Sequence, residues 1–335
     1  MCRSSAAIVD LCYAPMRFCL MLEGQEGVTW SEWVAAAQTA ERLGFDAIFT
    51  SDHYLSVMGN RERGSSDAWT NLAGLAAVTS TIRLGTLVSP VTFRLPAVLA
   101  KCAVTVDRIS HGRAEVGMGA GWWEQEHRTH GFPFPPAPER FDRLEDQLEI
   151  VHRLMTEDRF TFVGKHYRLD DVPFAPKGIQ TPHPPIIVGG GAGPRLARLV
   201  SRWADEYNTV GGPPASARER FERIRARLDA DGRNQDTLTT SLMTWCYVGA
   251  THADAMARIE RARERAMRAG TPDHELDELE RECIIGSAER AAERLSEYAA
   301  AGVQRIMLNH ELFDDLEMLE ILAEQVFPNV AEPGG

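Results

Sequence analysis

What the sequence lacks argues against a membrane protein, a nucleic-acid-binding protein and a protein built on disulfides or a cysteine-bound metal. No apolar run approaches the roughly 20 residues that a membrane-spanning helix needs, so we expect no membrane partner. Of the 36 basic residues only three are lysine, and 48 acidic residues bring the formal net charge to −12. This balance argues against nucleic-acid binding, which requires clustered Lys and Arg side chains. The six cysteines form no C-x-x-C pair and no metal-like spacing, so we predict free thiols in the cytoplasm.

The chain is long enough for either one large domain or two ordinary ones. Its 335 residues contain no low-complexity block and no obvious linker, which favours a single domain. Residues 1–15 contain one Arg and interrupt their apolar stretch with Asp10, a pattern that does not match a signal peptide. We therefore predict a disordered N-terminal extension over residues 1–15 and one domain over residues 16–330.

One unit recurs along the sequence: an amphipathic helix, a short turn and a brief apolar strand. Residues 30–43 place apolar side chains close to a 3.6-residue period, Gly44 ends this helix, and a buried strand follows. Near the other end, Ser287 is the expected N-cap of a helix over 288–301, again followed by a strand. In all we predict eight strands, at Arg17–Leu22, Ala47–Thr50, Arg83–Val88, Arg113–Gly117, Pro185–Val188, Glu206–Val210, Leu242–Val248 and Arg305–Asn309.

Apolar strands that alternate with helices are typical of a parallel sheet covered on both faces. Eight such units in one domain favour an α/β fold of the closed (β/α)8 TIM barrel type over the alternative, a doubly wound open sheet. Two insertions interrupt the repeat. Residues 156–184 contain a predicted hairpin with strands at 159–163 and 166–169. Residues 250–282 are highly charged and predicted to be helical.

In a barrel of this kind, the reactive groups lie at the carboxyl ends of the strands. The second predicted strand is followed by Ser51, Asp52, His53 and Tyr54. His53 is a candidate proton donor or acceptor near neutral pH, with Asp52 beside it to charge and orient the site. The alternative is a histidine whose ring nitrogens are satisfied by loop carbonyls.

Two glycine-rich segments follow later strands. Residues 117–121 alternate glycine with other residues before Trp122 and Trp123, a glycine density that core strands do not need. Residues 189–193 precede a helix whose exposed amides, together with Arg195, form a candidate anion site. The alternative for this second segment is a flexible strand-to-helix turn. It matches neither a Walker loop nor a dinucleotide fingerprint.

Four residues that follow the first glycine-rich segment in the sequence have side chains that can bind a metal. They are Glu124, Glu126, His127 and His130. All four lie on one short stretch, predicted to be helical, without a distant partner, so we predict no metal site. A G-x-S-x-G elbow is missing, as are paired carboxylates at clear strand ends of the kind that a glycosidase needs.

Four segments are distinctive when their order and spacing are considered together. They are Asp46–His53, Leu84–Arg94, Gly119–Trp122 and Gly189–Gly191. Together they resemble the luciferase-like monooxygenase superfamily, and more narrowly its branch of coenzyme F420-dependent oxidoreductases. The resemblance extends from about Met16 to Pro328, nearly the whole chain. It implies a (β/α)8 barrel with a deazaflavin or FMN lying across the mouth at the carboxyl ends of the strands.

The resemblance also implies roles for individual residues. Leu87, Val88 and Ser89 match a bulge that supports the cofactor ring, with a non-proline cis peptide bond expected at Leu87–Val88. His53, preceded by Asp52, matches a position beside the reactive ring carbon. The residues that match the segments along the ring, its tail and the phosphate are Gly119, Ala120, Gly121, Gly189, Gly190, Gly191, Ala192 and Arg195.

One position departs from the family pattern. A sugar-phosphate branch has a catalytic Glu where this chain has Trp122, so the resemblance does not imply a sugar-phosphate substrate. Trp122 and Trp123 instead favour a more apolar or aromatic wall against the substrate.

We therefore predict an oxidoreductase that transfers a hydride between reduced coenzyme F420 and an unsaturated small organic substrate, with His53 supplying the proton. The alternatives are an FMN-dependent monooxygenase on the same fold and a non-catalytic flavin-binding relative. An aldolase is disfavoured because none of the three lysines ends a predicted strand. The family resemblance implies a homodimer, and the identity of the substrate is not predicted.

Overall fold

The computed structural model describes residues 15–57, 61–268 and 282–331. The predicted extension over residues 1–15 lies outside the described residues, except for Pro15. The strands are β1 Arg17–Leu22, β2 Ala47–Thr50, β3 Arg83–Thr86, β4 Ser89–Pro90, β5 Ala114–Gly119, β6 Arg159–Val163, β7 Arg168–Pro173, β8 Ile186–Gly189, β9 Glu206–Val210, β10 Thr239–Gly249, β11 Ile284–Ser287 and β12 Arg305–Asn309. The α-helices are α1 Trp30–Arg42, α2 Ala68–Val78, α3 Pro96–Ile109, α4 Glu124–His130, α5 Ala137–Thr156, α6 Pro194–Trp203, α7 Pro214–Ala230, α8 His252–Arg268, α10 Ala288–Ala300 and α11 Leu316–Ile321.

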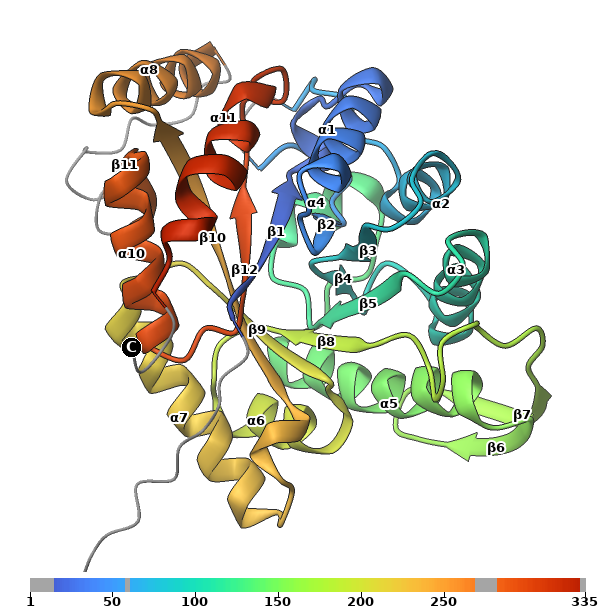
Figure 1. Ribbon diagram of the computed structural model, residues 1–335. Coiled ribbons are helices and arrows are strands. Elements are labelled where there is room, and N and C mark those ends of the chain that lie inside the picture. The colour runs from blue at the N-terminus through green and yellow to red at the C-terminus, as the bar shows by residue number, and fades with distance from the viewer. Residues whose placement is uncertain (1–14, 58–60, 269–281, 332–335) are drawn as a thin grey trace, which may run out of the picture.

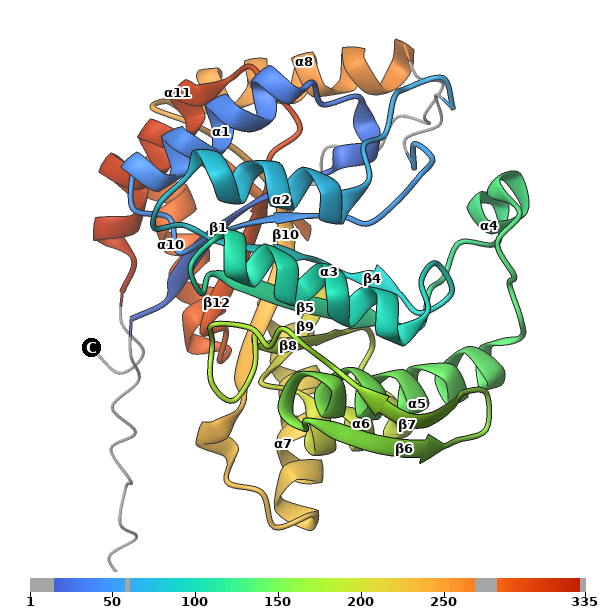
Figure 2. The same cartoon turned by 90° about the vertical axis from the view of Figure 1, so that its right-hand side faces the viewer.

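Eight parallel strands close into a barrel, shown in Figure 1. Around the barrel, each strand pairs with the next in the order β1, β2, β3, β5, β8, β9, β10 and β12, and β12 pairs again with β1. These are the eight strands expected from the sequence, so the predicted (β/α)8 barrel is confirmed. Helices surround the strands on the outside, as Figures 1 and 2 show.

The main differences from the predicted barrel strands concern β3, β10 and β11. β3 ends at Thr86 instead of Val88, because the chain leaves the barrel wall at Leu87 and pairs with β5 again only at β4. β10 extends beyond 242–248 at both ends, and its last four residues pair with β11, a strand that the prediction missed. Periodicity could not indicate β11, since its four residues run directly into α10.

Capping residues set the ends of the predicted helices. Before α1, the Thr29 side chain accepts a hydrogen bond from the Glu32 amide, and Glu32 Oε2 accepts one from the Thr29 amide at 2.7 Å. Gly44 follows the helix with a φ of +79°, a conformation that favours glycine. Ser287 caps α10 by accepting from the Arg290 amide, as predicted.

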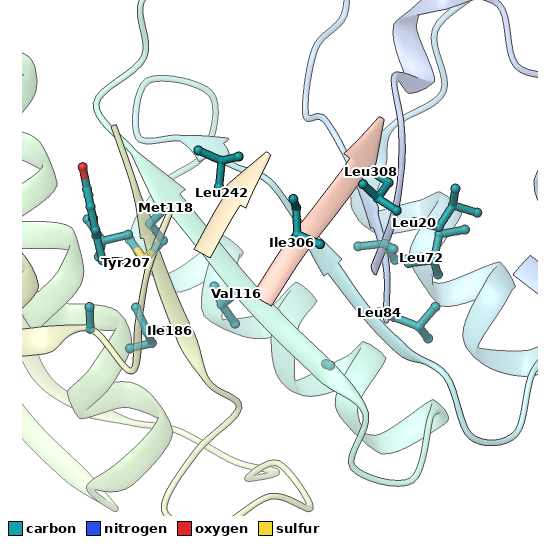
Figure 3. Packing of buried hydrophobic residues seen from close by; sticks show 14 of the residues in the cluster. Leu20, Leu72, Leu84, Val116, Met118, Ile186, Tyr207, Leu242, Ile306 and Leu308 are labelled. Carbon is teal, nitrogen blue, oxygen red and sulfur yellow. The ribbon is translucent and has the colours of Figure 1, made fainter. Parts of the chain in front are cut away.

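Apolar side chains form two layers of core. One lies between the strands and the surrounding helices, where Leu20, Leu84 and Leu72 belong to the same cluster (Figure 3). The second fills the interior of the barrel and comprises Cys19, Met21, Ala47, Phe49, Leu87, Ile187, Met243 and Met307. Both layers follow from the alternation of side chains along each strand, because neighbouring residues face opposite sides of the sheet.

The insertion over 156–184 forms the predicted hairpin. β6 pairs antiparallel with β7, and Figure 2 shows the two strands beside α5 on the outside of the barrel. β7 covers 168–173 instead of the predicted 166–169. The Gly164 amide donates to the Tyr167 carbonyl at 3.0 Å, so those residues close the turn before the second strand begins.

Other predictions concern the second insertion, the cysteines and the membrane. α8 is helical as predicted, and residues 269–281 lie outside the described residues. The described cysteines, Cys19, Cys102, Cys246 and Cys283, are free. Within the part of the chain that the structure describes, no helix has the length and apolar character needed to span a bilayer.

Candidate active site

A cavity of about 580 Å³ opens at the carboxyl ends of the barrel strands. Its volume lies within the range of about 300–1,000 Å³ that is typical of small-molecule sites. The lining residues come from the ends of nearly all the barrel strands and from the loops behind them. Eleven of the predicted site residues line it: His53, Leu87, Val88, Gly119, Ala120, Gly121, Trp122, Trp123, Gly189, Gly190 and Gly191. Asp52, Ser89, Ala192 and Arg195 do not line it.

The segment between β3 and β4 forms one wall of the cavity. The peptide bond Leu87–Val88 is cis, as the family resemblance implied, and both residues face the cavity. Ser89 lies behind this wall, where its hydroxyl donates to Asp52 Oδ2 at 2.6 Å and accepts from Trp69 Nε1 at 3.0 Å. Ser89 therefore anchors the bulge and does not contact the cavity.

Two glycines of the predicted cofactor segments make room for Val88. A Cβ on Gly119 would lie 2.7 Å from Val88 Cγ2, and a Cβ on Gly189 would lie 2.9 Å from Val88 Cγ1. Side chains at these positions would collide with Val88, which explains two glycines without any ligand. Gly121 has a φ of +78° and Gly190 a φ of +143°, conformations that also favour glycine.

The second glycine segment ends at the N-terminus of α6. Among the described residues, the amides of Gly191 and Ala192 donate no hydrogen bond. Unsatisfied amides at a helix N-terminus form a suitable anion site. The guanidinium of Arg195 is directed elsewhere: it pairs with Asp142 and donates to the Pro138 carbonyl at 2.8 Å. Its predicted contact with a phosphate thus stays a prediction.

His53 forms an ion pair with Glu126 from α4 in the wall of the cavity. His53 Nδ1 lies 2.8 Å from Glu126 Oε2, while Glu126 Oε1 accepts from the amides of Tyr54 and Leu55. Burial lowers the pKa of His53, but the hydrogen bond and negative charge of Glu126 outweigh burial and raise it above the usual value. The ring therefore stays protonated to a higher pH than a free histidine.

Asp52 does not contact the His53 ring, but its negative charge contributes to raising the pKa of His53. It is buried, and its Oδ2 is bound by the Ser89 hydroxyl and the Arg94 guanidinium. Arg94 also pairs with Asp67, so Asp52 belongs to a charge network behind the bulge. Burial raises the pKa of Asp52 above its usual value. Glu126, which the sequence analysis considered only as a metal ligand, is the carboxylate that holds the His53 ring.

Aromatic rings form the outer wall. The rings of Trp122 and Trp123 stack with their centroids 5.8 Å apart and an interplanar angle of 16°. The His53 ring lies edge-on to both, at 6.0 Å from each. Trp122 is 63% exposed, which places it at the mouth of the cavity. This wall agrees with the apolar surface expected from the two tryptophans.

The opposite side of the cavity contains three glutamates that the sequence analysis missed. Glu23 and Glu26 follow β1, and Glu311 follows β12. Glu311 accepts hydrogen bonds from Trp245 Nε1 at 3.0 Å and from the Tyr247 hydroxyl at 2.5 Å. His53 was predicted because reactive groups in a barrel lie at the carboxyl ends of the strands. Glu23 and Glu311 satisfy the same criterion, since each lies within two residues of a strand end.

The fold agrees with what the comparisons with known proteins show. A family model described as luciferase-like monooxygenase matches residues 15–305, and the chain belongs to this family. An F420-dependent glucose-6-phosphate dehydrogenase from Microbacterium testaceum is 28% identical over 87% of this chain and 90% of its own. An FMNH2-dependent dimethylsulfone monooxygenase from Pseudomonas putida is 32% identical over 58% of this chain and 53% of its own.

A solved structure extends the comparison of folds. The coenzyme F420-dependent tetrahydromethanopterin reductase from Methanopyrus kandleri superposes with a TM-score of 0.80, covering 95% of this chain and 100% of its own at 19% identity. At this identity the likeness concerns the fold. The protein is thus a luciferase-like barrel of an oxidoreductase family whose members include F420-dependent and FMNH2-dependent enzymes.

Proposed function

We propose that the protein is an oxidoreductase that transfers a hydride between reduced coenzyme F420 and an unsaturated small organic substrate. The observation that supports this best is the His53–Glu126 pair in the same cavity that the bulge and both glycine segments line. F420-dependent relatives that align with 87–90% of this chain support the same cofactor.

The residues of the cavity fit a deazaflavin. Leu87, Val88 and Gly119 provide an apolar surface on one side, and the free amides of Gly191 and Ala192 stand at the start of α6, where a phosphate is stabilised. When bound, a reduced deazaflavin supplies the hydride, while the protein supplies position and charge.

His53 is the group that holds the proton. Its Nδ1 is bound by Glu126, so Nε2 is the nitrogen left for a substrate atom. The raised pKa of the ring suits a proton donor near neutral pH. Glu126 is the positioning residue, because two backbone amides hold one of its oxygens while the other holds the ring.

An FMN-dependent monooxygenase is the second candidate. It is favoured by the Pseudomonas putida relative, described as FMNH2-dependent, whose similarity covers 58% of this chain. The larger coverage of the F420-dependent relatives leads us to prefer F420. A non-catalytic relative is a weaker candidate, since binding alone would not need a charged histidine in the wall of the cavity.

The experiment is a turnover assay of reduced F420 with a panel of enones and imines. We expect His53→Ala to lower the rate about 100-fold, the size of a general acid contribution, while binding of F420 changes little. The exposed histidine on α8 provides the control, and His252→Ala should leave both quantities unchanged. Full activity of His53→Ala would contradict the assignment of His53.

A further inference from the structure

The cavity has two chemically different sides. β3, β5 and β8 are neighbours in the barrel and provide the bulge and the glycine segments. β10, β12 and β1 are also neighbours. These strands and the residues that follow them provide Trp245, Glu311, Glu23 and Glu26. If the cofactor occupies the first side, as the proposed function requires, the second side faces the substrate. Its composition therefore bears on the class of substrate.

The second side is negatively charged and only partly neutralised. Glu26 is paired with Arg63 at 2.6 Å. Glu23, by contrast, accepts from two amide side chains, those of Gln25 at 2.7 Å and Asn309 at 3.3 Å, and Glu311 accepts from Trp245 and Tyr247. Within the described residues, these donors are all neutral. None of the described residues that line the cavity is Lys or Arg.

Two further observations describe the surroundings of these carboxylates. Asn309 is fully buried next to Glu23, and its Oδ1 has no hydrogen-bond partner within the described residues. Burial raises the pKa of Glu311, and the nearby Glu23 and Glu26 raise it further. Carboxylates that repel one another are stabilised by a cation with several N–H groups.

A metal ion is the other cation to consider. Among the described residues, no group of three or more His, Cys, Asp or Glu side chains has an arrangement that could hold a metal. The indoles of Trp122, Trp123 and Trp245 line the same cavity, and indole faces attract organic cations. The surroundings therefore favour an organic cation over a metal.

We propose that the substrate is a small organic molecule with a protonated amine, which the carboxylates of Glu23 and Glu311 bind at the end of the cavity away from the glycine segments. This inference rests on the proposed function only in assigning the other side to the cofactor. It disfavours a sugar phosphate, because a phosphate dianion at that end would face carboxylates with no Lys or Arg among the described lining residues.

Three probes of similar size test the proposal by calorimetry on the full-length protein, with and without F420. They are 2-phenylethylammonium, 2-phenylethanol and phenylacetate. We expect the ammonium to bind at least about tenfold more tightly than the alcohol, and phenylacetate not to saturate the site. Equal affinity for ammonium and alcohol, a preference for phenylacetate, or no saturable binding of the ammonium would overturn the proposal.

Variants locate the binding site of the ammonium. Glu311→Gln should weaken ammonium binding about tenfold and leave binding of the alcohol unchanged, and Glu23→Gln provides an independent second test. The exposed Glu324 is the matched control, and Glu324→Gln should change nothing. If Glu311→Gln and Glu23→Gln both bind the ammonium as the unaltered chain does, the proposal is wrong.

A separate titration with F420 distinguishes the two proposals. Ammonium preference without F420 binding would support the amine-binding site and contradict the proposed cofactor. F420 binding without a preference for the ammonium would support the proposed cofactor and contradict the amine-binding site.

Discussion

Carboxylates lie at both ends of the barrel, but Glu115 and Glu206 at the amino end have a buried counterion that Glu23 and Glu311 at the carboxyl end do not have among the described residues. At the amino end, Arg305 is 2% exposed and donates to Glu115 Oε2 at 2.6 Å and to Glu206 Oε2 at 2.9 Å. At the carboxyl end, Glu23 and Glu311 receive only neutral donors from the described residues. The chain itself therefore provides a counterion at the amino end, whereas we propose that a ligand provides the counter-charge for Glu23 and Glu311.

The pKa directions of Glu115 and Glu311 express the same difference, while burial raises the pKa of Glu206 at the amino end as well. Burial acts to raise the pKa of Glu115, but the charge of Arg305 outweighs it and lowers that pKa. For Glu311, burial is reinforced by neighbouring carboxylates, and the pKa is raised. A lowered carboxylate pKa contributes stability at neutral pH, while a raised one opposes stability there. In TIM barrels, stabilising residues lie at the amino end and functional ones at the carboxyl end.

The largest effect is expected from breaking the amino-end network. Arg305→Met leaves Glu115 and Glu206 buried with fewer counter-charges, and we expect a loss of about 3–5 kcal/mol in the free energy of unfolding. Glu311→Gln, at the other end, should change that free energy by less than about 1 kcal/mol because it removes a charge that lacks a counterion. Urea unfolding followed by tryptophan fluorescence measures both. Similar losses for the two variants would remove the distinction between the two ends.

A smaller loss of stability is expected when a glycine at the carboxyl end of the barrel is replaced by alanine. Gly119→Ala places a Cβ 2.7 Å from Val88 Cγ2, and such overpacking costs about 1–3 kcal/mol. Gly191→Ala is the matched control, since its Cβ would meet nothing within 4 Å. Unfolding by urea should separate the two variants. If both are equally stable, Gly119 does not make room for Val88.

The sequence was sufficient for the barrel but not for all of the site. Strand and helix periods identified the eight barrel strands because burial against helices imposes a regular pattern. β11 was missed because four residues beside a helix cap show no period. At the site, His53 was found by its place at a strand end, but its partner Glu126 comes from helix α4, 73 residues away. Contacts between segments that are distant in sequence leave no local pattern.

Predicted residues that lie behind the cavity illustrate the same limit. Asp52 and Ser89 are adjacent in sequence to lining residues, yet their side chains bond to Arg94 and Trp69 outside the cavity. Alternate residues of an extended chain face opposite ways, so neighbours of a lining residue often support it from behind. Glu23 and Glu311 could have been found, since each lies within two residues of the end of a predicted strand.

A pH profile tests the pair at the functional end. The pKa of His53 is raised, so reduction that uses its proton should proceed at low pH and fall as pH rises through this raised pKa. Glu126→Gln removes the charge that raises the pKa, and burial then lowers it. The falling limb of kcat/KM should therefore move to lower pH, whereas a limb that does not move would show that Glu126 does not tune His53. The His53–Glu126 pair also contributes to the free energy of unfolding. This contribution is present at low pH and is lost as pH rises through the raised pKa of His53 in the folded state.

The smallest effect is expected at Arg195. Its guanidinium is already neutralised by Asp142, so we expect Arg195→Met to weaken cofactor binding by less than about threefold, a difference below 1 kcal/mol. The titration is followed by quenching of the cofactor fluorescence. A loss of tenfold or more would place Arg195 at the phosphate after all, as the sequence had suggested.

The central claim is that the apolar and glycine-rich side of this cavity binds a deazaflavin. Its most direct test is a fluorescence titration of the purified full-length protein with F420 and, in parallel, with FMN. We predict saturable quenching with F420 at concentrations where FMN binds weakly or not at all. Tight binding of FMN together with no binding of F420 would contradict the claim and favour the monooxygenase.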